Sequence, residues 1–410
     1  HLLTRLSQRW AADMLNYYIF SKELHILPYL NGFFSIFCLS VSSVFSVKFL
    51  NIKVNTLVAV LLSLLCSVTP FYALSMYYNT GTVGHLSLSM GICGLYVAYQ
   101  YKSWYSKTLG MAMLVVAIGV YQVALQACLI LVFANYTYKT YLISKLNDAC
   151  KTIWELFFFT LFVCMSFIIS LSINAIIVEI FDLQIGGRHL DTTRIDFVYN
   201  ILNSYKLKQY NGEGLIYFKD SYIFLFKVIF ILAILGLGGV LFRANRRCLV
   251  FKIISYSVVL FIVFPILTHL PTILGYYIPF QAYYPVGWIV LSLASFCFVS
   301  QNNLLRSISL IILFCFIVVN IVYVNVFYYA AFRQKSLDDI RINQMVARIR
   351  THEDYIDEKS KLNLKIVGSL RDRSHFLVSG WKYGPYQAFG NRYTKYQAFK
   401  FFSDLNFKRM

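Results

Sequence analysis

The chain has 410 residues, of which 59% are hydrophobic and 13% are charged, whereas ordinary globular proteins carry about 25% charged residues. With a mean hydropathy of +0.62, this composition excludes a cytosolic globular domain, a disordered chain and, despite the net charge of +19, a nucleic-acid binder. The apolar residues form continuous runs of about 18–28 residues, the length at which a helix spans a hydrocarbon core of about 30 Å. An outer-membrane barrel would show alternating segments of about ten residues instead. The sequence therefore predicts an all-α polytopic membrane protein.

Nine apolar segments are long enough to be predicted as spans: 26–48, 54–77, 84–100, 108–135, 154–181, 221–242, 249–269, 284–300 and 307–329. Short basic loops favour the cytoplasm. Four turns carry such residues: Lys48 and Lys53; Lys102 and Lys107; Lys139, Lys145 and Lys151; and Arg243, Arg246 and Arg247. Segment 108–135 lies between two of these turns, which are both expected in the cytoplasm. A single crossing would instead put the two ends of the segment on opposite sides of the membrane. Two shorter helices that turn near Tyr121 and Gln122 reconcile all the markers, which gives about ten spans.

This orientation divides the chain into a transmembrane domain, residues 1–330, and a small C-terminal α/β domain, residues 331–410. The polar segments 1–24, 182–220 and 270–283 are then expected on the same non-cytoplasmic face as the C-terminal domain. An enzyme driven by cytoplasmic ATP or a nucleotide sugar would place its polar mass on the other face.

The tail 331–410 contains 16 basic and eight acidic residues. This excess suits solvation beside anionic lipid or affinity for an anionic phosphate lipid or its sugar. A helix is predicted to begin near Asp338 and Asp339, because acidic residues favour a helix N-terminus. A short strand is predicted at 364–367.

The N-terminal segment combines two arginines and a tryptophan with nearby carboxylates. A spacing of four places Arg5, Arg9 and Asp13 on one helical face. The arginines could bind a lipid phosphate beside a carboxylate. Alternatively, the segment is an interfacial helix in which the arginines extend to the headgroups and Asp13 pairs with Arg9.

The loop 182–220 offers a second group of phosphate-binding residues. Arg188 and Arg194 can bind phosphate bidentately, and His189 can donate to it. Asp191 and Asp196 could take a proton from a sugar hydroxyl, but an aspartate beside two arginines is more often an ion-pair partner. The sequence has neither a nucleotide-binding glycine motif nor a His/Cys cluster with metal-ligand spacing.

Three motifs resemble the Gtr type-II family of serotype-converting O-antigen glucosyltransferases of phage and prophage. Gln8-Arg9-Trp10 stands where the family has a GRW motif after its first span, with glutamine in place of glycine. Tyr121 and Gln122, in GVYQVALQ, match the family's YQ segment. The tail helix DDIRINQMVARIR is similar through Asp339, Ala347, Arg348 and Ile349.

The resemblance implies a GT-C-like membrane glycosyltransferase in the bacterial inner membrane, with its active face in the periplasm. Its donor would be polyprenyl-phosphate-glucose and its acceptor a lipid-linked O-antigen, without a cofactor. The donor phosphate would be bound by Arg5, Arg9, Arg188, His189 and Arg194, and the sugars by Trp10, Tyr121, Gln122, Tyr276 and Tyr277.

The catalytic base is expected from an acidic pair that family members carry shortly before the GRW stretch. This place precedes His1, so we expect roughly 20–40 further N-terminal residues that include a membrane span. Asp13 and Glu23 are the nearest carboxylates within the sequence.

Two other functions fit parts of the pattern. Another GT-C glycosyltransferase or an O-antigen polymerase would also carry a large periplasmic loop with arginines. A lipid-sugar flippase or transporter would instead show repeated halves and polar groups at mid-membrane, whereas the polar residues of this sequence are concentrated on one face.

Overall fold

A computed structural model describes residues 10–11, 28–69, 81–143, 146–180, 220–239, 246–267, 285–351, 362–364 and 407–409. The chain divides into two compact units. The membrane unit comprises residues 1–209 and 219–321, and the C-terminal unit comprises residues 210–218 and 322–410.

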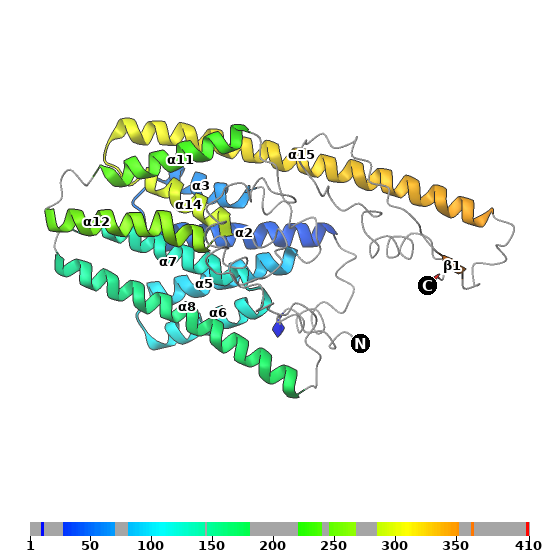
Figure 1. Ribbon diagram of the computed structural model, residues 1–410, viewed down its shortest axis with the longest axis horizontal. Helices are drawn as coiled ribbons and strands as arrows, with labels where there is room; N and C mark the ends of the chain where they lie inside the picture. Colours follow the sequence, from blue (N-terminus) through cyan, green and yellow to red (C-terminus); the bar gives the residue numbers. More distant parts are fainter. Residues whose placement is uncertain are drawn as a thin grey trace. The chain divides into compact units, whose positions relative to one another are not determined.

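Each of the nine predicted apolar segments contains a helix in the membrane unit (Figure 1). The helices are α2 (Pro28–Leu50), α3 (Thr56–Ser67), α5 (Gly81–Gln100), α6 (Trp104–Val120), α7 (Val123–Leu142), α8 (Leu146–Ile180), α11 (Asp220–Gly238), α12 (Arg246–Val258), α14 (Pro285–Cys297) and the first part of α15 (Asn303–Arg350). Helix α12 continues through a short π-helix, η4 (Val259–Val263).

Four stretches of the described helices are long and apolar enough to cross a membrane: Gly32–Leu50, Asp148–Ile180, Cys248–Leu267 and Asn303–Val326. Shorter apolar helices lie between them in the sequence, at Thr56–Ser67, Trp104–Val120, Phe224–Gly238 and Val286–Cys297. Many large apolar side chains of α8 and α15 are exposed, such as Ile168 (53%) and Ile311 (62%), as expected of helices that face lipid. The chain is therefore a multi-pass membrane protein.

The predicted helix break near Tyr121 is confirmed. α6 ends at Val120, Tyr121 has an extended backbone (φ −157°, ψ 124°), and α7 begins at Val123. The hydroxyl group of Ser87, on α5, lies 2.7 Å from the carbonyl oxygen of Ala117 and 2.8 Å from that of Tyr121. These carbonyls also accept from the backbone N–H groups of Tyr121 and Ala124, and the hydroxyl group of Ser87 adds a hydrogen bond from α5 that stabilises the break.

Contacts with α8 show that α6 and α7 run in opposite directions. Lys107 lies 5.1 Å from the centre of the Phe158 ring, and Ser166 lies 2.7 Å from the sulfur of Met111, so α6 runs parallel to α8. α7 instead ends close to the start of α8, where Lys139 pairs with Glu155. The chain therefore turns back at Tyr121, which brings Lys107 and Lys139 to one end of the unit.

The other basic turns meet at this same end, which we call the basic end. Phe49, beside Lys48, packs against Tyr99 with the rings tilted and 4.8 Å between their centres, and Tyr99 lies beneath Lys139. Lys252, near the start of α12, donates to the carbonyl oxygen of Tyr141 at 2.9 Å. The turns that carry Lys48, Lys102 and Lys139, and the start of α12, thus share one end, as the charge pattern requires.

Helix α7 forms the centre of the membrane unit. It contacts α2, α5, α6, α8, α12, η4 and α14, and nearly all of its side chains are buried, as expected of a helix that is apolar on every side. Its neighbours α5 and α6 approach closely through two glycines, since a Cβ on Gly94 would lie 2.8 Å from the carbonyl oxygen of Gly110. Small residues allow such close approach of membrane helices.

The tail differs from its predicted local structure at two points. No helix begins at Asp338, because α15 continues without a break from Asn303 to Arg350. The segment that joins the two predicted helices, AAFRQKSL, contains neither glycine nor proline to end a helix. A strand is observed at β1 (Leu362–Leu364), two residues before the predicted start at 364, and it pairs in parallel with β2 (Phe407–Arg409), with Leu362 opposite Phe407. The rest of the predicted strand, 365–367, lies outside the described residues.

Candidate functional site

Most of the residues predicted to bind substrate lie outside the described residues. This holds for Arg5, Arg9, Asp13, Glu23, Arg188, His189, Arg194, Tyr276 and Tyr277. Trp10, Tyr121 and Gln122 are described, and the geometry of the site is built from them.

Trp10 lies against α6 and α8, far from its own position in the sequence. Its indole Nε1 donates to the hydroxyl oxygen of Ser170 at 3.2 Å, across 160 residues. A side chain on Gly119 would overlap the indole ring, so the absence of a Cβ at Gly119 makes room for Trp10. Because Gly119 is two residues from Tyr121, the structure brings two separately predicted sugar-binding segments together. We call Trp10, Ser170 and the turn at Tyr121–Gln122 the turn site.

The two residues of the turn differ in exposure. The side chain of Tyr121 is only 7% exposed, whereas that of Gln122 is half-buried. The hydroxyl group of Ser87, on α5, donates to the carbonyl oxygen of Tyr121 and so holds the backbone of the turn against α5. A buried tyrosine beside a fixed backbone supports the shape of the turn, while a half-buried amide can donate to and accept from a ligand.

A face of small polar residues on α8 was not predicted from the sequence. Ser166, Ser170 and Asn174 follow one another at intervals of four residues, and all are buried. We call these three residues the α8 polar face. Polar side chains at intervals of four within an apolar span could have indicated this face. They are neutral, however, and only ionisable side chains within a span were expected to indicate a functional site. His85, on α5 two residues before Ser87 and fully buried, was also missed.

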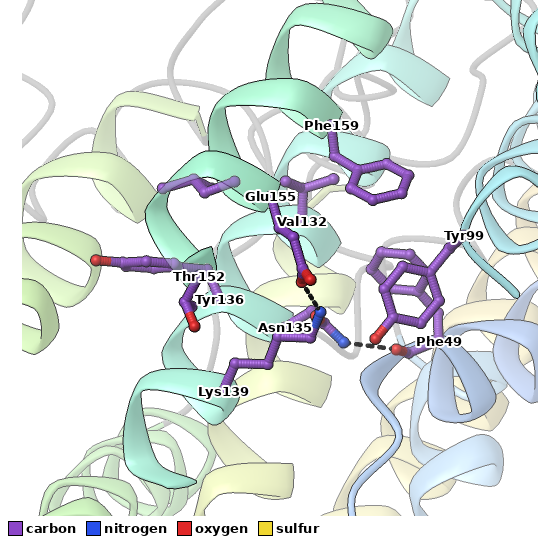
Figure 2. Close-up of a pocket in the computed structure, with 10 residues that line it drawn as sticks. Phe49, Tyr99, Val132, Asn135, Tyr136, Lys139, Thr152, Glu155 and Phe159 are labelled. Atoms are coloured by element: carbon purple, nitrogen blue, oxygen red, sulfur yellow. Dashed lines mark hydrogen bonds and ion pairs between the residues drawn. The ribbon is translucent and has the colours of Figure 1, made fainter. Parts of the chain in front are cut away.

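A second polar centre lies at the basic end, in a small pocket between α2, α5, α7 and α8 (Figure 2). Its polar side chains are those of Tyr99, Asn135, Tyr136, Lys139, Thr152 and Glu155. Lys139 and Glu155 form an ion pair and are 27% and 37% exposed, and the Lys139 ammonium lies 4.9 Å from the centre of the Tyr99 ring.

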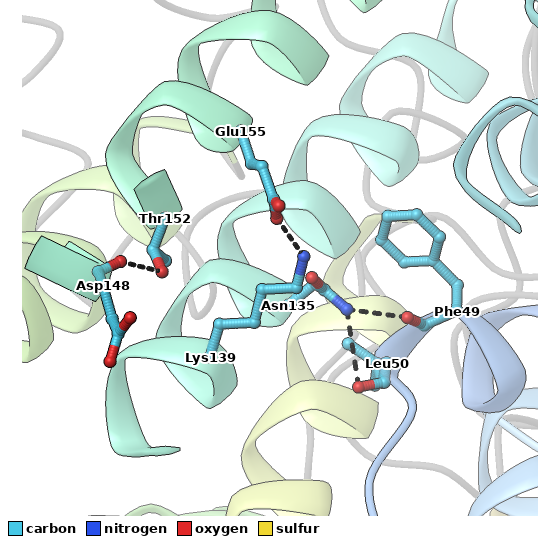
Figure 3. Close-up of polar contacts among 7 residues, drawn as sticks. All are labelled: Phe49, Leu50, Asn135, Lys139, Asp148, Thr152 and Glu155. Atoms are coloured by element: carbon cyan, nitrogen blue, oxygen red, sulfur yellow. Dashed lines mark hydrogen bonds and ion pairs between the residues drawn. The ribbon is translucent and has the colours of Figure 1, made fainter. Parts of the chain in front are cut away.

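The polar groups around this ion pair are held by the backbone (Figure 3). The amide of Asn135 donates to the carbonyl oxygens of Phe49 at 2.7 Å and of Leu50 at 3.5 Å, where α2 ends. Thr152 donates to the carbonyl oxygen of Asp148 at 2.9 Å. Asn135 thus satisfies carbonyls that a helix C-terminus leaves without partners, and the pocket joins α2 and α8 to the central helix α7.

The two polar centres are far apart along α8. Fifteen residues separate Glu155 from Ser170, which corresponds to about 22 Å of helix. The pocket at the basic end has mutually neutralised charges, and the turn site is built from neutral groups. Within the described ranges, no group of three His, Cys, Asp or Glu side chains could hold a metal ion.

The family model described as Glucosyl transferase GtrII matches residues 5–285, more than half of the chain. The matched range includes Trp10, the break at Tyr121 and all of α8. No curated protein and no solved structure matches the chain.

Proposed function

Because the chain belongs to the Glucosyl transferase GtrII family, we propose that it transfers glucose from polyprenyl-phosphate-glucose to a sugar of a lipid-linked O-antigen. The transfer takes place at the end of the membrane unit that carries the turn site, and this end faces the periplasm of a bacterial inner membrane. The product is a glucosylated O-antigen, which changes the serotype of the cell.

The observation that carries this proposal is the separation of the basic turns from the turn site. Lys48, Lys107 and Lys139 meet at one end, and basic residues in short loops favour the cytoplasm. Trp10 and Tyr121 lie toward the other end of the same helices. A lipid-linked donor and acceptor would meet at that end without any cytoplasmic nucleotide.

The chemistry assigns one role to each predicted group. A carboxylate takes the proton of an acceptor hydroxyl group as its oxygen attacks the anomeric carbon of glucose; Asp13 and Glu23 are the nearest such groups to the GRW-like segment in the sequence. The bond from that carbon to the phosphate oxygen breaks, and polyprenyl phosphate leaves.

The remaining predicted residues bind the two substrates. Arg5, Arg9, Arg188, His189 and Arg194 stabilise the charge on the phosphate. Trp10, Tyr121, Gln122, Tyr276 and Tyr277 bind the sugars.

The proposal is tested with sealed membrane vesicles that contain the full chain. Radiolabelled polyprenyl-phosphate-glucose and lipid-linked O-antigen are supplied, and label in the O-antigen is measured. We expect transfer, with glucose as the added sugar. A chain that lengthens the O-antigen without adding glucose would be a polymerase, and one that only moves the lipid-linked sugar across the vesicle membrane would be a flippase.

The orientation is tested separately by fusions at Met410. An alkaline phosphatase fusion is expected to be active and a green fluorescent protein fusion to be dark, because the phosphatase folds in the periplasm and the fluorescent protein does not. The opposite pair of signals would reverse the assignment of the two ends.

A further inference from the structure

The α8 polar face contains one group that the protein itself leaves without a partner. Ser166 is placed to donate to the Met111 sulfur or the Phe162 carbonyl oxygen, and Ser170 accepts from Trp10. Asn174, one helical turn further along, is 7% exposed, and its Oδ1 atom has no hydrogen-bond partner.

Leaving a carbonyl group buried and unpaired is costly. An apolar side chain at this position would avoid this cost. Among the described residues, Asn320 on α15 is a second buried amide with unpaired atoms. Only Asn174 of these two lies on the helix that carries the partner of Trp10, so its amide has a nearby site to serve.

The surroundings of Asn174 fit a neutral ligand rich in hydroxyl groups. An amide both donates and accepts, as a sugar hydroxyl does, and the indole of Trp10 offers an apolar ring. Asn174 lies about 6 Å along the helix from Ser170, a separation that one sugar ring can bridge. It is six residues from the end of α8 at Ile180, on the side of the proposed active face.

We infer that Asn174 binds a hexose ring of the substrate through hydrogen bonds from its amide to the sugar hydroxyls, beside Trp10. This inference rests on the proposed function and adds to it a binding residue that lies on a membrane helix and not in a predicted loop. The hexose is either the glucose of the donor or a sugar of the acceptor, and the two sources are separated by experiment.

The test compares Asn174→Ala and Asn174→Leu with Ser172→Ala, a matched control whose exposed hydroxyl donates only to Ile168 of its own helix. Each purified full chain is titrated with polyprenyl-phosphate-glucose and, separately, with lipid-linked O-antigen. We expect the Asn174 variants to raise the KM for one substrate about tenfold. We expect Ser172→Ala to leave both values unchanged. A rise for the donor assigns Asn174 to glucose, and a rise for the acceptor assigns it to the O-antigen.

Thermal unfolding of the same variants distinguishes recognition from a packing role. Removal of an unpaired buried amide should leave the Tm unchanged or raise it, at least in Asn174→Leu, which keeps the branched shape of the side chain. Unchanged KM values for both substrates, or a lowered Tm in both variants, would overturn the inference. A wild-type chain that transfers no glucose would instead overturn the proposed function.

Discussion

At the basic end of the membrane unit, the lysines that lie among the helices have protein partners. Lys139 pairs with Glu155, and Lys252 donates to the Tyr141 carbonyl. The side chains of the turn site are neutral, and on the adjoining α8 polar face the amide oxygen of Asn174 has no partner. Charges that satisfy one another serve folding and orientation, whereas a buried neutral group without a partner still has a hydrogen bond to offer to a ligand. This difference supports the proposal that the substrates bind at the turn site and not at the paired charges of the basic end.

The largest effect is expected from the arginines proposed to hold the donor phosphate. Arg9→Ala and Arg188→Ala should each lower glucose transfer by about 10²–10³-fold, because the charge that develops on the phosphate loses its stabilisation. Arg→Lys should recover only part of this loss, since lysine cannot bind bidentately. The rate is measured in vesicles at matched protein levels.

Lys102→Ala is the control for these arginine variants, because it removes an exposed positive charge at the basic end. It should transfer glucose at the wild-type rate. If Lys102→Ala and Arg9→Ala lowered glucose transfer equally, the two ends would not differ in function.

A smaller effect is expected at Gly119. In Gly119→Ala the new methyl group overlaps the Trp10 indole, so Trp10 must move and the turn site is distorted. We expect a loss of about 1–3 kcal/mol in stability, together with slower transfer. Gly238→Ala is the matched control, since a Cβ there meets no atom within 4 Å. If both variants are fully active, the position of Trp10 is unimportant for transfer.

Ser87→Ala tests the turn without touching Trp10. The carbonyls of Ala117 and Tyr121 lose their hydroxyl partner, and we expect unfolding in detergent to become easier by about 1 kcal/mol. The KM for at least one substrate should also rise as the turn loosens. Wild-type stability would show that the helix break does not depend on α5.

The smallest effect is expected at the basic end. Glu155→Gln leaves Lys139 without its carboxylate. Because the two side chains are 27% and 37% exposed, the free energy of unfolding should fall by about 1 kcal/mol or less. Glucose transfer should not change. A double-mutant cycle with Lys139→Met isolates the pair, and a large loss of transfer in Glu155→Gln would place substrate at the basic end instead.

The comparison also shows which residues of the site could be predicted from the sequence. The charge pattern predicted the break at Tyr121, because the basic turns on both sides of 108–135 had to share one face. The family motifs indicated Trp10 and Tyr121 separately. Neither source indicated Ser170 or Asn174, since their neutral side chains resemble ordinary residues of an apolar span. The continuation of α15 past Asp338 was missed because an acidic pair suits both the start of a helix and its interior.

The sequence by itself determined that the chain is helical, crosses the membrane several times and turns its basic loops to one end. Hydropathy and charge belong to each residue, and the bilayer acts on them one segment at a time. Only the tertiary structure decided that Trp10 meets Ser170 across 160 residues and that Lys139 pairs with Glu155. These contacts depend on the rotation and neighbours of each helix. The rotation and neighbours of the helices are fixed by the close approach of the glycine-bearing helices α5 and α6 and by the burial of α7. The sequence of a single segment predicts neither the close approach nor the burial.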